Sequence, residues 1–136
     1  MAWIHKEIRI EANPQDVWLA ISDVGAAHRR LTPGVLTDAR LDGDNARIVT
    51  FADGTVAREL IVALDHQARR FAYASVGGRA IHHNASFQVF DDGDGCTRLV
   101  WITDVLPDEL ASFVGQRIEL GSAVIKQTLE RRQAPS

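Results

Sequence analysis

The chain has 136 residues, of which 46% are hydrophobic and 24% charged, and its formal net charge is -3 at pH 7. These values are typical of one globular domain, so we expect a single domain over residues 1–136 and exclude a disordered, collagen-like or coiled-coil chain. The acidic balance disfavours a nucleic-acid partner, which needs a basic surface, and the single cysteine excludes an internal disulfide.

The amino-terminal part predicts one strand and two short helices. Residues 3–11 alternate between apolar and polar side chains, which indicates a half-buried strand. Asn13 and Pro14 suit the cap and the first position of a short helix. A second short helix is predicted over residues 24–31, and the Thr-Pro-Gly sequence of residues 32–34 ends it.

Between residues 35 and 106 the hydrophobic pattern changes to a period of two. Six strands are predicted, at residues 35–41, 47–51, 55–64, 71–76, 82–90 and 97–106. Short turns separate them, several with Asp-Gly or Gly-Gly pairs, which are typical of hairpins. The whole segment therefore predicts an antiparallel meander.

A long helix is predicted over residues 108–132. Pro107 and two acidic residues suit its start, and apolar side chains then recur at spacings of three and four. Such a helix is about 37 Å long. Both the helix and the sheet must bury an apolar face, which favours a sheet that wraps around the helix and leaves a pocket between them.

Several local motifs resemble those of one known superfamily. Residues 13–18, Asn-Pro-Gln-Asp-Val-Trp, are similar to the start of its first helix, and residues 58–65 and 69–73 are similar to its fourth and fifth strands. Residues 92–107 are similar to its last hairpin and the entry to its final helix. In the order and spacing of these motifs, the chain resembles the helix-grip (SRPBCC) superfamily of START lipid-transfer domains, and especially its bacterial polyketide cyclase/dehydrase-like branch.

This resemblance implies an α+β helix-grip fold. A curved seven-stranded antiparallel sheet would wrap around the long C-terminal helix, with two short helices between strands 1 and 2. The resemblance also implies a cavity, but it does not imply one reaction, because the superfamily includes carriers, cyclases and co-chaperone regulators. We expect neither a cofactor nor a metal site.

His83 is the first candidate site residue. Neighbouring strand residues point to opposite faces of a sheet, so His82 and His83 cannot easily bind one metal ion. His83 shares its face with Ala85 and Phe87, the more apolar set, and is predicted to point inward. Three roles stay open for it: a hydrogen-bonded structural residue, a ligand contact, or a general base.

Arg47 and Glu59 form a second candidate pair across the turn at residues 52–54. A two-residue loop places Arg47 opposite Leu60, whereas a three-residue loop places Arg47 opposite Glu59. In the second register, the pair is either a structural salt bridge or a polar anchor at the wall of the pocket.

The sequence pattern does not decide which face of the last strand, residues 97–106, points inward. Trp101 and Thr103 lie on one side and Asp104 on the other, and apolar residues accompany both sides. Trp18 is either a core residue or pocket wall, and Arg117 is either a solvated charge or a partner for an acidic head group. The full set of candidate ligand-binding residues is His83, Phe87, Trp101, Thr103, Glu59, Ile61, Phe51, Tyr73, Trp18, Phe113, Arg117, Leu120 and Val124.

The leading functional hypothesis is the binding or transport of a small hydrophobic ligand in this cavity. A lipid, an aromatic compound or a polyketide-like molecule would suit it. An alternative is a polyketide cyclase or dehydratase that works by proton transfer, with His83 and Glu59 as candidate catalytic residues. A third is a chaperone-regulator-type protein-interaction module. We favour binding over catalysis, because a catalytic histidine needs an oriented partner.

The chain carries no sign of export or membrane insertion. Its first seven residues include charged side chains without a following apolar segment, which excludes a signal peptide. No stretch reaches the roughly 18 apolar residues of a membrane-spanning helix. We therefore expect a cytoplasmic protein, a monomer or homodimer, whose partner is a small hydrophobic molecule.

Overall fold

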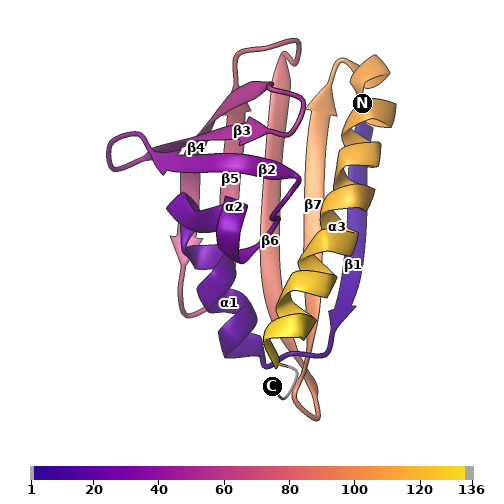
Figure 1. The fold of residues 1–136 in the computed structure, drawn as a ribbon. Helices are drawn as coiled ribbons and strands as arrows, with labels where there is room; N and C mark the ends of the chain where they lie inside the picture. Colours follow the sequence, from indigo (N-terminus) through magenta and orange to yellow (C-terminus); the bar gives the residue numbers. More distant parts are fainter. Residues whose placement is uncertain (1, 134–136) are drawn as a thin grey trace.

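The computed structural model describes residues 2–133, which form one antiparallel sheet, a group of short helices and one long helix (Figure 1). The strands are β1 (Ala2–Ile10), β2 (Leu36–Leu41), β3 (Ala46–Phe51), β4 (Val56–Asp65), β5 (Arg70–Val76), β6 (His82–Gly93) and β7 (Cys96–Leu106). The helices are α1 (Pro14–Ser22), the 3-10 turn η1 (Val24–Ala26), α2 (Ala27–Arg30), the 3-10 turn η2 (Asp108–Leu110) and α3 (Ala111–Gln133). The seven strands pair in the order β1-β7-β6-β5-β4-β3-β2, so the predicted α+β helix-grip fold is confirmed.

Local sequence explains where the first helix begins. The side chain of Asn13 accepts a hydrogen bond from the Gln15 N–H at 2.9 Å, and Pro14 occupies the first turn, as predicted. Val17, Trp18 and Ile21 are buried on one face of α1, because residues three and four apart share a helix face.

Several boundaries differ from the sequence prediction, among them the start of the long helix at Ala111 after the turn η2, and two of these differences have a clear local cause. The second short helix is divided into η1 and α2, because the Ala26 N–H bonds to the Asp23 carbonyl three residues back and closes a tighter turn. The last hairpin is also tighter than the predicted turn over residues 91–95. Strand β6 continues to Gly93, which pairs with Cys96, and both residues between them have positive φ, as a two-residue hairpin turn requires.

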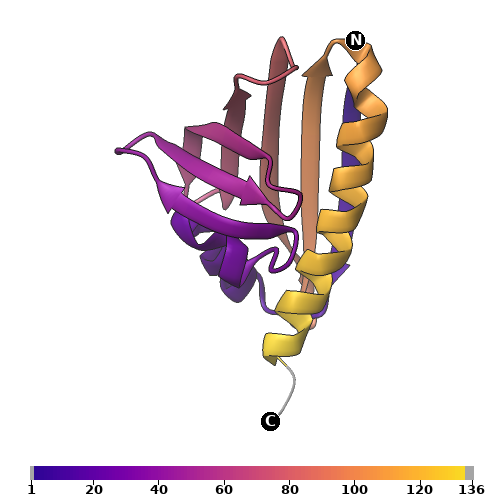
Figure 2. The ribbon, with the colours of Figure 1, turned by 45° about the horizontal axis from the view of Figure 1, so that its top comes forward.

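The sheet bends strongly between its two halves. In Figures 1 and 2, β2 and β3 lie across the direction of β6, β7 and β1. The pairing of β4 with β5 shifts register between Ile61 and Ala63, and such bulges bend a strand and increase its twist. Helix α3 packs against β1, while η1 and α2 pack against β2, so the helices lie at the two opposite edges of the sheet.

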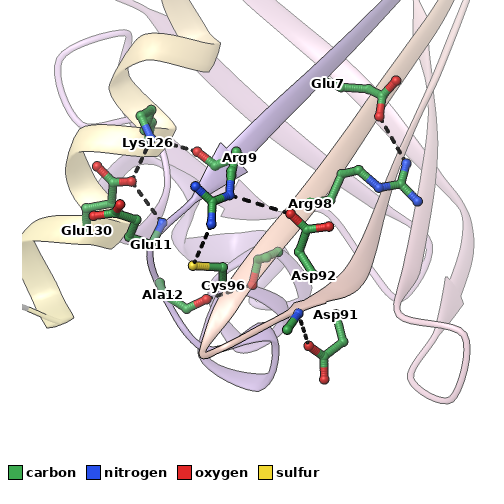
Figure 3. A network of polar contacts seen from close by, with 12 residues as sticks. Glu7, Arg9, Glu11, Ala12, Asp91, Asp92, Cys96, Arg98, Lys126 and Glu130 are labelled. Carbon is green, nitrogen blue, oxygen red and sulfur yellow. Dashed lines mark hydrogen bonds and ion pairs between the residues drawn. The ribbon is translucent and has the colours of Figure 1, made fainter.

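Polar contacts tie the carboxyl-terminal half of α3 to the end of β1 (Figure 3). The Lys126 ammonium donates to the Arg9 carbonyl at 2.6 Å and lies 2.7 Å from a Glu130 oxygen. The same Glu130 oxygen accepts the Glu11 N–H at 2.9 Å. These contacts fix the carboxyl-terminal half of α3 against the end of β1. No helix within residues 2–133 is long and apolar enough to cross a membrane.

Candidate functional site: a cavity between the sheet and α3

A cavity of about 510 Å³ lies between the sheet and the amino-terminal half of α3. Side chains of β3 to β7, of α2 and of the loop between β5 and β6 line its sheet side. Its helix side is formed by Leu110, Phe113, Val114, Arg117, Ile118 and Gly121, which come from η2 and the first part of α3. The lining is mainly apolar, as is usual for sites that bind small molecules.

Aromatic side chains form one wall of this cavity. The rings of Phe71, Tyr73, Phe87 and Trp101 follow one another with centroid separations of 5.4, 6.2 and 4.5 Å. Strand register explains the row, because Phe71 pairs with Phe87 and Phe87 pairs with Trp101 across neighbouring strands. Phe71, at one end of the row, is buried in the core, whereas the other three rings border the cavity.

The inward face of β7 is the one that carries Trp101 and Thr103. Both line the cavity, and Asp104 is exposed on the opposite face. The indole N–H of Trp101 is buried and lies close enough to the Tyr73 hydroxyl to lower the pKa of that group.

Arg47 and Glu59 form a buried ion pair at the cavity wall. The structure places Arg47 opposite Glu59, as the three-residue loop requires. The Nε and Nη2 atoms of Arg47 each lie 2.9 Å from Glu59 Oε1, and Nη1 donates to the Val24 carbonyl at 3.1 Å. The guanidinium also lies 5.1 Å from the Phe71 ring centroid and 5.4 Å from that of Tyr73. The pair therefore joins β3 and β4 to η1.

His83 and Tyr73 add two uncharged polar groups to the lining. Burial lowers the pKa of His83, and the charges of His82 and Arg117 lower it further, although Glu59 acts in the opposite direction. The imidazole is therefore neutral at neutral pH, with one donor and one acceptor nitrogen. Burial raises the pKa of the Tyr73 phenol, and the charge of Glu59 adds to this shift, so the hydroxyl keeps its proton.

Arginine side chains lie at the edge of the cavity. The Arg117 guanidinium lies 3.8 Å from the Phe51 ring centroid and 4.5 Å from that of Phe113. Its Nη2 atom is 3.4 Å from Asp53 Oδ2. The Arg79 guanidinium, from the loop between β5 and β6, lies 5.5 Å from the same Phe113 ring. Two cations therefore flank one exposed aromatic ring.

Most of the candidate residues from the sequence come together around the cavity. Those that line it are His83, Phe87, Trp101, Thr103, Glu59, Phe51, Tyr73, Phe113 and Arg117. They come from β3 to β7 and from α3, so residues far apart in sequence share one wall. A ligand contact for each of them stays a prediction.

Four candidate residues lie outside the cavity. Trp18 is 2% exposed in the core under α1, where its indole N–H donates to His66 Nδ1 at 3.1 Å. Ile61 lies at the β4 bulge and packs against the core. Leu120 is exposed and Val124 half-buried, since Leu120 lies about 200° around the helix from the inward-facing Ile118.

Several lining residues, among them Val114, Ile118 and Arg79, were not among the candidates predicted from the sequence. Val114 and Ile118 lie on the predicted apolar stripe of the long helix, and the four-residue spacing would have identified them. Arg79 lies in an irregular loop after Gly77 and Gly78, both of which have positive φ, and no local pattern predicts where such a loop points. Among residues 2–133, no three His, Cys, Asp or Glu side chains gather in a way that could hold a metal ion.

Comparison with known proteins agrees with this fold. Residues 1–132 match the family described as polyketide cyclase / dehydrase and lipid transport. The chain belongs to that family. The resemblance to the START-like superfamily is thereby confirmed. Among curated proteins, no sequence matches this chain.

Solved structures of similar fold cover nearly the whole chain. The protein XoxI from Bacillus cereus is 17% identical with a TM-score of 0.86, and the match covers 99% of this chain and 100% of that one. A START superfamily protein from Mycobacterium smegmatis is 12% identical with a TM-score of 0.81, over 96% and 98% of the two chains. Norcoclaurine synthase from Thalictrum flavum, in complex with dopamine and hydroxybenzaldehyde, is 20% identical with a TM-score of 0.74, over 99% and 88%. At these identities the matches establish the fold alone.

Proposed function

We propose that this protein binds a small, largely apolar molecule with an aromatic or acyl body in the cavity between the sheet and α3. The observation that carries the proposal is the cavity of about 510 Å³, which is bordered by Tyr73, Phe87 and Trp101 on the sheet and by Phe113 on the helix. Apolar burial stabilises such a complex by about 25 cal/mol per Å², less the entropy lost on association.

The polar groups of the lining would orient the ligand rather than transform it. The Tyr73 hydroxyl and the neutral His83 imidazole are placed to exchange hydrogen bonds with a carbonyl or hydroxyl. Glu59 is already held by Arg47, so it is a poor choice for orienting His83 as a base. The family description names lipid transport, and norcoclaurine synthase holds aromatic molecules in a similar fold.

Tryptophan fluorescence tests this proposal, because Trp101 alone among the three tryptophans lines the cavity. Titration with a panel of aromatic and acyl compounds should change the emission of the wild type. The Trp101→Phe variant should lose most of that change, whereas Trp3→Phe should keep it, since Trp3 is 64% exposed outside the cavity. If calorimetry detects no binding of any compound up to its solubility limit, the proposal is wrong.

A cyclase or dehydratase is the second candidate function. The family description includes cyclases and dehydrases, and a neutral His83 in an apolar cavity can accept a proton near neutral pH. Such an enzyme would need turnover to depend on His83. Equal turnover of a poly-β-ketone analogue by the wild type and by His83→Ala would exclude His83 as the base. The interaction-module hypothesis gains less support, because it does not use the cavity.

A further inference from the structure

We propose that the ligand of this cavity is an anion, an aromatic or acyl carboxylate whose charged group lies against Arg117 and Arg79 at the edge of the cavity. The inference rests on the proposed function, since it names the chemical class of molecule that the same cavity takes. It follows from the distribution of charge along the lining and from the way in which Arg117 is held.

The lining has an excess of positive charge, although the whole chain is acidic. Its ionisable side chains with a full charge at neutral pH are Arg47, Arg79, Arg117 and Glu59, whereas the chain has a net charge of -3. The buried ion pair between Arg47 and Glu59 neutralises both partners. The two remaining guanidinium groups give the edge of the cavity a local positive potential, which attracts anions.

Arg117 is held by two aromatic rings in a way that leaves most of its donors available. The guanidinium lies over the rings of Phe51 and Phe113, at 3.8 and 4.5 Å from their centroids. Stacking uses the flat faces of a guanidinium and leaves the N–H groups along its edge free to bind a carboxylate with two parallel hydrogen bonds. A side chain fixed in this way loses little conformational entropy when a ligand arrives.

The carboxylate that already contacts Arg117 is a weak partner. Asp53 Oδ2 is 3.4 Å from Arg117 Nη2, and the Asp53 side chain is 61% exposed to water. Its other oxygen accepts the Thr55 N–H at 2.9 Å within its own turn. Hydrogen bonds from Thr55 lower the pKa of Asp53 more than the charge of Arg117 does. A ligand carboxylate in the cavity can therefore bind the remaining donors of Arg117.

Arg79 places a second cation beside the same ring. Its guanidinium lies 5.5 Å from the centroid of Phe113, which is 45% exposed at the cavity edge. Asp108 and Glu109 begin the helical segment at this end of the molecule, but neither lines the cavity. An anion between Arg117 and Arg79 would keep its apolar body in contact with Phe113 and the aromatic wall.

Calorimetric titration with a matched pair of probes tests the proposal. Naphthoate and naphthalenemethanol share one aromatic body, and only the first carries a charge at neutral pH. We expect naphthoate to bind about tenfold more tightly, which is the usual advantage of charge-assisted hydrogen bonds. This advantage should shrink as salt is raised, because the cavity edge is open to solvent.

Substitutions of single arginines test which residues cause the preference for naphthoate. Arg117→Gln should remove most of the preference for naphthoate and leave naphthalenemethanol binding almost unchanged. Arg98→Gln is a matched control, since Arg98 also stacks on a phenylalanine, Phe90 at 4.5 Å, and pairs with Glu7 at 3.0 Å, but lies outside the cavity. This control should keep the full preference. If Arg117→Gln does not fold, Arg79→Gln and the salt series give the same comparison.

The possible results separate this proposal from the proposed function. Equal affinity for the two probes in the wild type would overturn the anion proposal and leave the binding function supported. A naphthoate preference that survives both Arg117→Gln and Arg79→Gln would also overturn it. Failure of both probes to bind would count against the binding function itself, and the anion proposal would fall with it.

Discussion

At the scale of single residues, β4 carries two ion pairs that differ in their surroundings. Glu59 pairs with Arg47 inside the molecule, and the two side chains are 10% and 6% exposed. The preceding residue, Arg58, pairs with Asp42 on the outer face, where the side chains are 48% and 44% exposed. Because consecutive side chains of a strand point to opposite faces, two similar ion pairs lie in very different dielectric environments.

We predict that removal of Arg47 destabilises the protein far more than removal of Arg58. Arg47→Ala leaves the Glu59 carboxylate buried without its partner, which costs about 3–5 kcal/mol. Arg58→Ala leaves Asp42 in water, and the loss of an exposed pair costs less than about 1 kcal/mol. Urea unfolding followed by circular dichroism measures both values. Similar losses for the two variants would show that the Arg47 pair contributes no more than a surface pair.

At the scale of elements, α3 has two glycines with different neighbours. A Cβ added at Gly121 would lie 3.2 Å from two ring atoms of Trp101, whereas one added at Gly115 would lie 3.9 Å from Ile4 Cδ1. The first distance is too short for an ordinary contact and the second is a normal one. Gly121 therefore allows the Trp101 ring to approach the helix closely.

Alanine at these two positions should act differently. Gly115→Ala should stabilise the protein by about 0.5–1 kcal/mol, because alanine favours the helix and meets no close neighbour. Gly121→Ala should increase the stability of the protein less than Gly115→Ala does. It should also weaken the binding of an aromatic probe, since Trp101 must move toward the cavity. Thermal unfolding and calorimetric titration measure the two effects. Unchanged probe affinity in Gly121→Ala would contradict this role of the glycine.

The rotation of α3 about its own axis is not determined by the local sequence pattern. Periodicity correctly predicted a long helix with an apolar stripe, and Phe113 and Arg117 do line the cavity. Leu120 and Val124 do not, because Leu120 lies on the opposite side of the helix from Ile118 and Val124 lies beyond the amino-terminal half that borders the cavity. An apolar stripe whose residues recur at spacings of both three and four covers a wide part of the helix surface. Contacts between the helix and distant strands decide which side of that stripe faces the cavity.

At the scale of the whole molecule, polar contacts join the last part of the chain to its beginning. Lys126 and Glu130 of α3 contact Arg9 and Glu11 at the end of β1 (Figure 3). Hydrogen bonds from the Glu11 N–H and from Lys126 hold the pKa of Glu130 below its usual value of 4.5, against a small opposite effect of burial.

The contacts of Glu130 should make the stability of the protein depend on pH. A carboxyl group whose pKa is lowered by folding adds stability that is complete above its unfolded pKa and is lost as the pH falls through its folded pKa. We expect Glu130→Gln to be less stable than the wild type at neutral pH, and the difference to shrink as the pH falls below 4.5. Urea unfolding across this range measures it. A difference in the free energy of unfolding that stays constant with pH would show that the charge of Glu130 does not stabilise the protein.

The sequence by itself determined the order of the elements, the antiparallel meander and the two possible registers of Arg47. These features depend on local periodicity, turn residues and helix caps, which act over a few residues. Only the tertiary structure decided that Trp101 rather than Asp104 faces inward, that Trp18 belongs to the core, and that Arg79 reaches the cavity edge. Such features depend on how the bent sheet and α3 pack together, and this packing joins residues that no local pattern connects.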